Sequence, residues 1–275
     1  MKIKFTFCML LIFVISSCKE QEKSGSQVEN DRVGSESSLS LTNSEADLIV
    51  NKAIAFAGGL DAWKSKKSLS YTKLIQNYDS LGNLTREISQ LHQYQLQPSF
   101  KAKMSWEDNG DAFVIINNGK RAWQLKNGEV LTSEEATNSA WNSSFGSHYV
   151  IGMPFKLKDP GTILTYEGVD TLSNGEVVHA IKATYEKGTG SSGGMHTWWY
   201  FFDKNTYELK ANFLDSGNGY SITQYFGYDT IDTIKINKQR KSYRSNENRD
   251  LVVLGTVYSN TNIEFNVHFE DGYFN

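Results

Sequence analysis

The sequence predicts a mainly β (α+β) fold, in which a single large curved antiparallel sheet forms an unclosed β-barrel of about 10–11 strands. From residue 68 onward, short apolar runs follow one another and are separated by turns rich in Gly, Asn and Asp. Aromatic residues are abundant, with 6 Trp, 14 Tyr and 15 Phe, while there are only 3 Pro. Helical patterns are few and do not alternate with the strands, which excludes a βαβ fold. A sheet this long must curl, close or split.

An amphipathic helix is predicted at the start of the folded region. Residues 42–45 (TNSE) have the spacing of a capping box. The apolar residues that follow recur at helical spacing on one face: Ala46, Ile49, Val50, Ala53, Ile54 and Ala57. Gly58 and Gly59 end the pattern. We expect this N-terminal helix, and a mid-chain helix from Glu134 to about Ser144, to serve as plug and lid of the curled sheet.

The strand pattern is clearest in three places. Residues 108–110 (DNG) lie between two apolar runs, which is typical of a tight β-hairpin. Apolar and polar residues alternate in residues 262–270, so this strand is expected to have one buried and one exposed face. Residues 198–202 (WWYFF) are apolar on both faces, which indicates either a central strand covered on both sides or a strand that lines an apolar cavity.

The first 17 residues have the order of a secretory signal peptide. Lys2 and Lys4 precede an apolar run over residues 5–15, which is too short for the ~20 residues of a membrane-spanning helix. Residues 15–18 (ISSC) resemble the bacterial lipobox. This resemblance implies that cleavage falls before Cys18, and that Cys18 then carries acyl chains, such as palmitate, that anchor the protein to a membrane.

Residues 18–41 are expected to form a flexible tether after the acylated cysteine, because they are polar and rich in Ser and Glu. Residues 19–22 (KEQE) resemble the charged signal that directs some Bacteroidetes lipoproteins to the cell surface. The expected location is therefore the outer membrane, at its periplasmic or its cell-surface face, and we favour the surface.

Residues 42–275 are expected to form one domain. Within it, residues 49–59 (IVNKAIAFAGG) with Trp63, and residues 200–209 (YFFDKNTYEL), resemble the LolA/LolB-like family of lipoprotein carriers and receptors. The second segment looks like the strand–Asp-x-x-Thr–strand hairpin of that family. The resemblance implies a half-open barrel with helices as a lid over an apolar cavity that takes acyl chains. The contacts of that family to its transporter or acceptor are not matched here, so lipoprotein transfer itself is not implied.

Eight side chains are candidates for the lining of such a cavity. They come from the N-terminal helix and from predicted strands: Ile49, Ala53, Met104, Trp106, Trp123, Trp198, Tyr200 and Phe202. An acyl chain gains on the order of 10 kcal/mol from burial, whether in a bilayer or in a protein. Exchange between the two can therefore be nearly neutral, and a cavity suffices without any chemistry.

No catalytic or metal-binding residue is predicted, and neither is a cofactor. Residues 190–194 (GSSGG) match G-x-S-x-G, but a nucleophile elbow needs a helix after it, and the residues that follow are strand-like. The five His have no metal-ligand spacing, and we interpret them as surface or turn residues. The carboxylate pairs Asp229/Asp232 and Glu134/Glu135 fit turns and a helix start.

Charge argues against nucleic acid as a partner. The formal net charge is −3, and loss of Lys2 and Lys4 with the signal peptide makes it −5. Six basic residues lie within residues 235–249, where they could touch lipid head groups, but a solvated loop explains them more simply. Cys8 would leave with the signal peptide, so no disulfide is expected.

Two functions fit these patterns. The first is a non-catalytic, membrane-anchored envelope lipoprotein that binds a hydrophobic ligand, the acyl chain of a lipid or lipoprotein, in a half-barrel cavity. The alternative is a surface-exposed recognition module with a filled core, which binds a glycan or another envelope protein. A hydrolase is disfavoured because the sequence shows no nucleophile–base arrangement.

Overall fold

The computed structural model describes residues 31–191 and 193–275, with side chains from residue 44. Residues 39–275 form one compact unit, and every strand that the structure describes belongs to it. The predicted signal peptide over residues 1–17 and the acylation site Cys18 lie outside the described residues.

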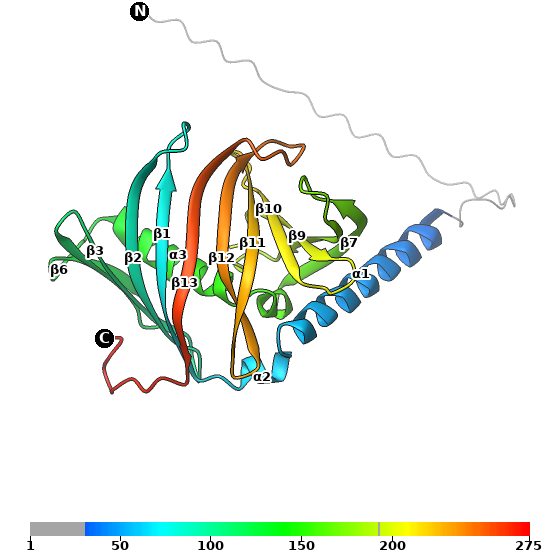
Figure 1. Cartoon of the computed structure of the whole chain (residues 1–275). Helices are drawn as coiled ribbons and strands as arrows, with labels where there is room; N and C mark the ends of the chain where they lie inside the picture. The colour runs from blue at the N-terminus through cyan, green and yellow to red at the C-terminus, as the bar shows by residue number, and fades with distance from the viewer. Residues whose placement is uncertain (1–30, 192) are drawn as a thin grey trace, which may run out of the picture. The chain divides into compact units, whose positions relative to one another are not determined.

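The described part of the chain forms one antiparallel sheet of thirteen strands, which confirms the mainly β prediction (Figure 1). The strands of the first half are β1 (Ser68–Tyr78), β2 (Leu84–Gln95), β3 (Lys101–Asp108), β4 (Asp111–Asn117), β5 (Ala122–Lys126) and β6 (Glu129–Val130). Those of the second half are β7 (Thr162–Thr171), β8 (Val177–Tyr185), β9 (Thr197–Asp203), β10 (Leu209–Asp215), β11 (Tyr220–Ile231), β12 (Ile234–Ser245) and β13 (Val253–Phe265). The count exceeds the expected 10–11 because the short strands β5 and β6 extend one edge.

The sheet consists of two meanders joined at their first and last strands. Its order is β6-β5-β4-β3-β2-β1-β13-β12-β11-β10-β9-β8-β7, and β1 pairs with β13 from Leu69 opposite Phe265 to Asn77 opposite Thr256. The two ends of this order, β6 and β7, do not pair, so the barrel is open. The chain therefore leaves the sheet at one edge and re-enters it at the other. Helix α3 (Glu134–Ile151) makes this crossing (Figure 1).

Helix α1 (Asp31–Phe56) supplies the predicted apolar stripe to the core. All six residues of that stripe, Ala46 to Ala57, are buried in one cluster with Leu69, Tyr200 and Ile236 of the sheet. The helix begins at Asp31, before the capping-box spacing at residues 42–45. Residues 31–41 contain no Pro, so no residue there forces the helix to stop, and residues 42–45 lie inside it.

Helix α3 begins where the sequence predicts and ends later. The Ser133 hydroxyl accepts a hydrogen bond from the Ala136 amide at 3.1 Å, which caps the helix. The helix continues to Ile151 rather than ending near Ser144. His148 and Ile151 are buried in register with Ser144, so the buried stripe extends beyond the predicted end and stabilises the last two turns.

The predicted C-terminal strand over residues 262–270 was wrong in its bounds. Strand β13 is continuous from Val253 and ends at Phe265. Asn262 and Asn266 have φ of 52° and 58°. Asn262 lies at a bulge opposite β1, and Asn266 directly follows the strand. Asn tolerates this left-handed conformation better than most residues, so both positions can adopt it.

Both edges of the sheet are irregular. The edge strand β6 contains two residues. The opposite edge strand, β7, has a register shift against β8 between Tyr166 and Gly168. Each edge therefore presents only a short regular row of free backbone groups.

The C-terminal end of α1 is fixed to the sheet by backbone contacts. The Lys235 amide donates a hydrogen bond to the Ala57 carbonyl at 2.9 Å, and Gly58 follows with φ of 114°. Helix α2 (Leu60–Lys64) then places Trp63 on Phe155 of the short 3-10 helix η1 (Phe155–Lys158), with the rings stacked at 4.8 Å. The C-terminal end of α1 is thus held by a backbone hydrogen bond and by the aromatic packing of the helix that follows it.

We predict that Gly58→Ala destabilises the fold by roughly 3 kcal/mol, because a Cβ there would meet the Thr233 carbonyl oxygen and would lie 3.0 Å from the Ile234 Cα. Gly59 also has a positive φ, but a Cβ there meets nothing within 4 Å. Gly59→Ala is therefore the matched control and should cost only about 1 kcal/mol. Urea unfolding of the two variants measures the difference. Equal losses would show that α1 is not held against Thr233.

Candidate functional site

Helix α3 carries a stripe of small polar residues beside its buried stripe. The stripe consists of Ser139, Asn142, Ser143, Gly146 and Ser147, and all of them line an open space between α3 and the sheet. The buried stripe holds the helix in place, since the Asn117 amide donates to the Ser144 hydroxyl at 3.0 Å. Larger side chains in the small-residue stripe would fill the space, so the small residues leave it open.

This space, which we call the inner cavity, has a volume of about 510 Å³. Its floor is formed by β1–β5 and β13. The apolar part of the floor consists of Ile75, Ile88, Met104, Trp106 and Ile115. The polar part consists of Lys73, Asn77, Arg86, Gln90, Gln124 and Tyr258. The cavity is thus amphipathic, and its volume lies in the range of ligand sites.

A second space, the helix groove, lies on the neighbouring side of α3 and has a volume of about 630 Å³. Its apolar lining consists of Trp141, Phe145, Val150, Met195 and Trp198. Trp141 and Phe145 stack with their centroids 6.1 Å apart, and the Met195 side chain is 80% exposed. Asn142 and Gly146 line both spaces, so the groove meets the inner cavity at these two residues.

Two buried cations lie close to the floor of the inner cavity: Lys73 lines it, and Arg240 lies behind Tyr258. Lys73 is 9% exposed and Arg240 is 7% exposed. The Lys73 ammonium and the Arg240 guanidinium each lie 4.9 Å from the centroid of the Tyr258 ring. They reach it from β1 and β12, the two strands that flank β13. Cation–π contact offsets part of the cost of removing both charges from water.

Neither cation forms an ion pair with a carboxylate among the described residues. No Asp or Glu is among the described residues that line the inner cavity. Arg86, the other cation in the lining, is paired with Asp108 at 2.6 Å. Burial and, after it, the Arg240 charge together lower the pKa of Lys73 from 10.5 to about 7.

A neutral histidine connects the cavity floor to the core. His92 is fully buried, and burial is the main cause that holds its pKa well below its usual range, followed by the charges of Lys73 and Arg240. Its Nδ1 lies 2.7 Å from the Tyr94 hydroxyl and 3.2 Å from that of Tyr71. Its Nε2 lies 3.0 Å from Gln90 Oε1. Because that oxygen only accepts, Nε2 donates to it, and the single lone pair of Nδ1 accepts from the nearer hydroxyl, that of Tyr94.

The structure brings only some of the predicted cavity residues to an open space. Met104 and Trp106 line the inner cavity, and Trp198 lines the helix groove. Ile49, Ala53, Tyr200 and Phe202 are buried in the core around α1, which side chains fill. Trp123 is half-buried under the Arg121 guanidinium, and it alternates with Gln124, which lines the inner cavity, so it points to the other face of the sheet.

Sequence reasoning missed Lys73, His92 and Arg240. The interpretation of every His as a surface or turn residue was wrong for His92 and for His148, which are buried. The interpretation of residues 235–249 as a solvated loop was also wrong, because β12 (Ile234–Ser245) occupies most of that segment. A signal was present: Lys73 shares the period-two face of Leu69 and Tyr71, and Arg240 that of Ile234 and Ile236.

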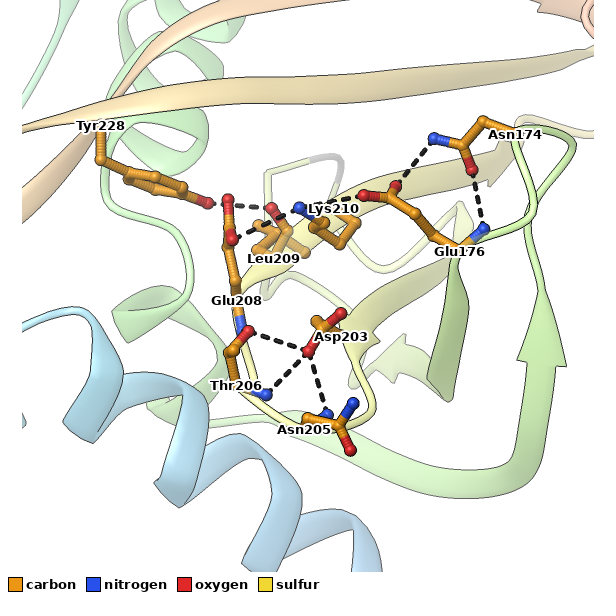
Figure 2. Close-up of polar contacts among 9 residues, drawn as sticks. All are labelled: Asn174, Glu176, Asp203, Asn205, Thr206, Glu208, Leu209, Lys210 and Tyr228. Carbon is orange, nitrogen blue, oxygen red and sulfur yellow. Dashed lines mark hydrogen bonds and ion pairs between the residues drawn. The ribbon is translucent and has the colours of Figure 1, made fainter.

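The hairpin over residues 200–209, on which the family resemblance partly depends, uses its polar side chains to stabilise the turn between β9 and β10. Figure 2 shows the Asp203 carboxylate accepting hydrogen bonds from the Asn205 and Thr206 amides, at 3.0 and 2.7 Å, and from the Thr206 hydroxyl. Lys210 lies between Glu176 and Glu208 at 3.1 and 3.3 Å. The polar side chains of this region are thus occupied in fixing the β9–β10 turn and its neighbours.

The other motifs give no reactive centre in the described residues. Residues 190–194 lie between strands β8 and β9, not before a helix, and Ser192 lies outside the described residues. No group of three or more His, Cys, Asp or Glu is placed to hold a metal ion in the part that the structure describes. Among its helices none has an apolar stretch long enough to cross a bilayer.

An open antiparallel sheet with a helical plug and a helix across its inner face is the half-barrel of LolA-type proteins, and three solved structures share it. A candidate outer membrane lipoprotein-sorting protein domain from Vibrio parahaemolyticus matches with a TM-score of 0.53 and 11% identity, over 85% of this chain and 97% of that one. A LolA superfamily protein from Nitrosomonas europaea matches with 0.53 and 9% identity, over 84% and 97%. A DUF1329 family protein from Desulfovibrio piger matches with 0.51 and 10% identity, over 84% and 97%.

These likenesses define the fold class. The chain itself belongs to the family of unknown function DUF6503, whose model matches residues 37–225. No curated protein matches the sequence.

We predict that Lys73→Met stabilises the protein by about 1–4 kcal/mol below pH 7, because it removes a buried charge that no carboxylate among the described residues neutralises. The folded pKa, about 7, lies below the unfolded value of 10.5, so the unfolded chain binds more protons between these values. The burial cost is fully present below pH 7 and declines as the pH rises toward 10.5. The stabilisation that Lys73→Met gives should therefore be smaller at about pH 9 than at about pH 6.

Urea unfolding at both pH values measures the gain. Lys241→Met removes the same charge from the opposite face of β12, where Lys241 lies over Phe226, and should change stability by less than about 0.5 kcal/mol. A loss of stability in Lys73→Met at both pH values would contradict the prediction.

Proposed function

We propose that this protein is an envelope protein that holds the acyl chain of a lipid or lipoprotein along α3, without catalysing a reaction. The helix groove takes the chain, and the inner cavity takes the polar end of the ligand. The observation that carries the proposal is the junction of the two spaces at Asn142 and Gly146. At these residues a groove of aromatic and aliphatic side chains adjoins a cavity with a partly polar floor. An amphiphile matches this arrangement, because its apolar chain is followed by a polar end.

Burial alone supplies the binding energy in this proposal. Each methylene contributes ~0.8 kcal/mol on transfer from water to an apolar site. Trp141, Phe145 and Trp198 offer flat apolar walls for such a chain, and Met195 offers a flexible one. Two neighbours with the same half-barrel are a LolA superfamily protein and a candidate lipoprotein-sorting domain, which supports a role with lipids in the envelope.

Membrane attachment in this proposal comes from lipid on Cys18. The predicted tether over residues 18–41 follows, although its last part, residues 31–41, is helical as the start of α1, and the half-barrel domain over residues 42–275 comes next. The lipobox-like residues 15–18 support acylation, and the export-like residues 19–22 support the outer membrane and its surface face. The partners are then the membrane, acyl chains and other envelope proteins, and nucleic acid is not among them.

A recognition module that binds a glycan or an envelope protein is the second candidate. The filled core around α1 favours it, because a binding module needs no internal space. The open space beneath α3 favours the lipid-binding function, since the small residues of α3 maintain a cavity that a recognition module would have no reason to keep.

We predict that Gly146→Leu abolishes or weakens acyl binding at least tenfold, because the leucine side chain would occupy the junction of the groove and the cavity. A Cβ at Gly146 meets nothing within 4 Å, and leucine favours the helix by about 0.8 kcal/mol over glycine, so the variant should fold. Native mass spectrometry of the full chain with Cys18→Ala, purified without detergent and then mixed with palmitic acid, measures occupancy.

Asn138→Leu is the control, because Asn138 is an exposed α3 residue that lines neither space. Equal occupancy in the Gly146→Leu variant and its control would place the acyl chain elsewhere. A clean apo mass for the parent chain, with no uptake of palmitic acid, would favour the recognition module.

We predict that Cys18→Ala in the otherwise unchanged chain moves the protein from the membrane to the soluble envelope fraction, because no acyl chain is then attached. Cell fractionation followed by immunoblotting measures the distribution. Cys8→Ala is the control, since Cys8 lies within the predicted signal peptide and should leave the distribution unchanged. Retention of the Cys18→Ala protein in the membrane would refute the anchor.

A further inference from the structure

The floor of the inner cavity has an uncompensated positive charge. Lys73 lines the cavity and Arg240 lies beside it, both are more than nine-tenths buried, and both contact the Tyr258 ring at 4.9 Å. The Lys73 ammonium makes no hydrogen bond and no ion pair with any residue that the structure describes. A buried charge is ordinarily paired, so this arrangement favours an anion as the partner of Lys73.

The neutral groups around Lys73 are also arranged for a negative partner. Gln90 Oε1 is engaged by His92 Nε2 at 3.0 Å, which directs the amide NH₂ of Gln90 away from His92 as a free donor in the cavity lining. The stripe of α3 opposite adds the hydroxyls of Ser139 and Ser143. No described carboxylate lines the cavity to compete for these donors.

We propose that the inner cavity binds an anionic group, a carboxylate or a phosphate, with Lys73 as its charged contact and Gln90 as a neutral donor. This inference rests on the proposed function in one respect: the anion is taken to be the polar end of the acyl ligand. Arg240 does not line the cavity, and its charge adds to the positive potential from behind Tyr258. The apolar floor, Ile75, Met104 and Trp106, holds the first carbons of the chain.

The binding of the anion should depend on pH in a defined direction. The charged and titratable groups that face Lys73 are Arg240 on β12, Arg86 and neutral His92 on β2, and Tyr258 on β13, while α3 contributes only uncharged residues. Lys73 itself has a pKa of about 7, so it loses its charge as the pH rises through that value. A carboxylate stays ionised there, so its affinity should fall as the pH rises above 7.

The experiment compares two probes of equal chain length, dodecanoate and dodecan-1-ol, each below its aggregation concentration, by isothermal titration calorimetry on the full chain with Cys18→Ala. Inorganic phosphate serves as a third probe without a chain. At about pH 6, dodecanoate should bind about 10- to 100-fold more tightly than the alcohol. Lys73→Met should remove this difference and leave the affinity for dodecan-1-ol unchanged. Lys241→Met is the charge-matched control on the opposite face of the sheet and should keep the difference.

Each outcome decides between the two proposals. Equal affinity for dodecanoate and dodecan-1-ol in the parent chain would overturn the anion site and leave acyl binding standing. Binding of phosphate that Lys73→Met abolishes, without binding of either chain, would support the anion site and overturn acyl binding. Binding of none of the three probes would overturn both. A dodecanoate preference that survives Lys73→Met would place the anion elsewhere and overturn the role of Lys73.

Discussion

The pairing of β1 with β13 is the constraint on which the rest of the structure depends. It joins two meanders into one sheet, so that the chain leaves the sheet at β6 and must return at β7, the far edge. The intervening segment has to cross one face of the sheet, and α3 is that segment. Because α3 is held at both edges, small side chains along one of its stripes suffice to keep a space open beneath it.

The inner face of the sheet therefore has two regions of different character. Around α1, aliphatic and aromatic side chains fill the space completely, and this region supplies most of the stability of the domain. Beneath α3, the strands carry Lys73, Gln90 and Arg86 among apolar neighbours, and the helix contributes serines. A buried lysine and a neighbouring arginine lower stability, and such a cost is characteristic of sites that are retained for binding rather than for folding.

Local patterns in the sequence were enough for the fold class, the α1 stripe and the start of α3, because each depends on residues that are close in the chain. The bounds of β13 were missed for two reasons. The bulge at Asn262 lies inside the strand rather than at its start, and the alternation of polar and apolar residues continues past Phe265, although the strand ends there and Asn266 is left-handed. The core around α1 was mistaken in part for a cavity lining, since a run such as residues 198–202 is apolar whether it faces a void or a plug.

The proximity of Lys73 and Arg240, the two cations that contact Tyr258, could not be predicted for a different reason. Lys73 and Arg240 meet only because β1 and β12 flank β13, and no local pattern specifies which distant strands become neighbours. Each residue by itself did carry a signal, as a basic side chain in the register of buried apolar residues. A charge in that register can be recognised in a sequence, whereas its partner across the sheet needs the topology.

The irregular edges of the sheet bear on how copies of this protein behave when they are crowded together. Growth of a fibril, or capture of an extended peptide as an extra strand, requires a long uninterrupted ladder at an edge. A two-residue β6 and a bulged β7 provide no such ladder. Concentrated copies are therefore expected to stay apart as individual domains, and any association must use side-chain surfaces such as those beside α3.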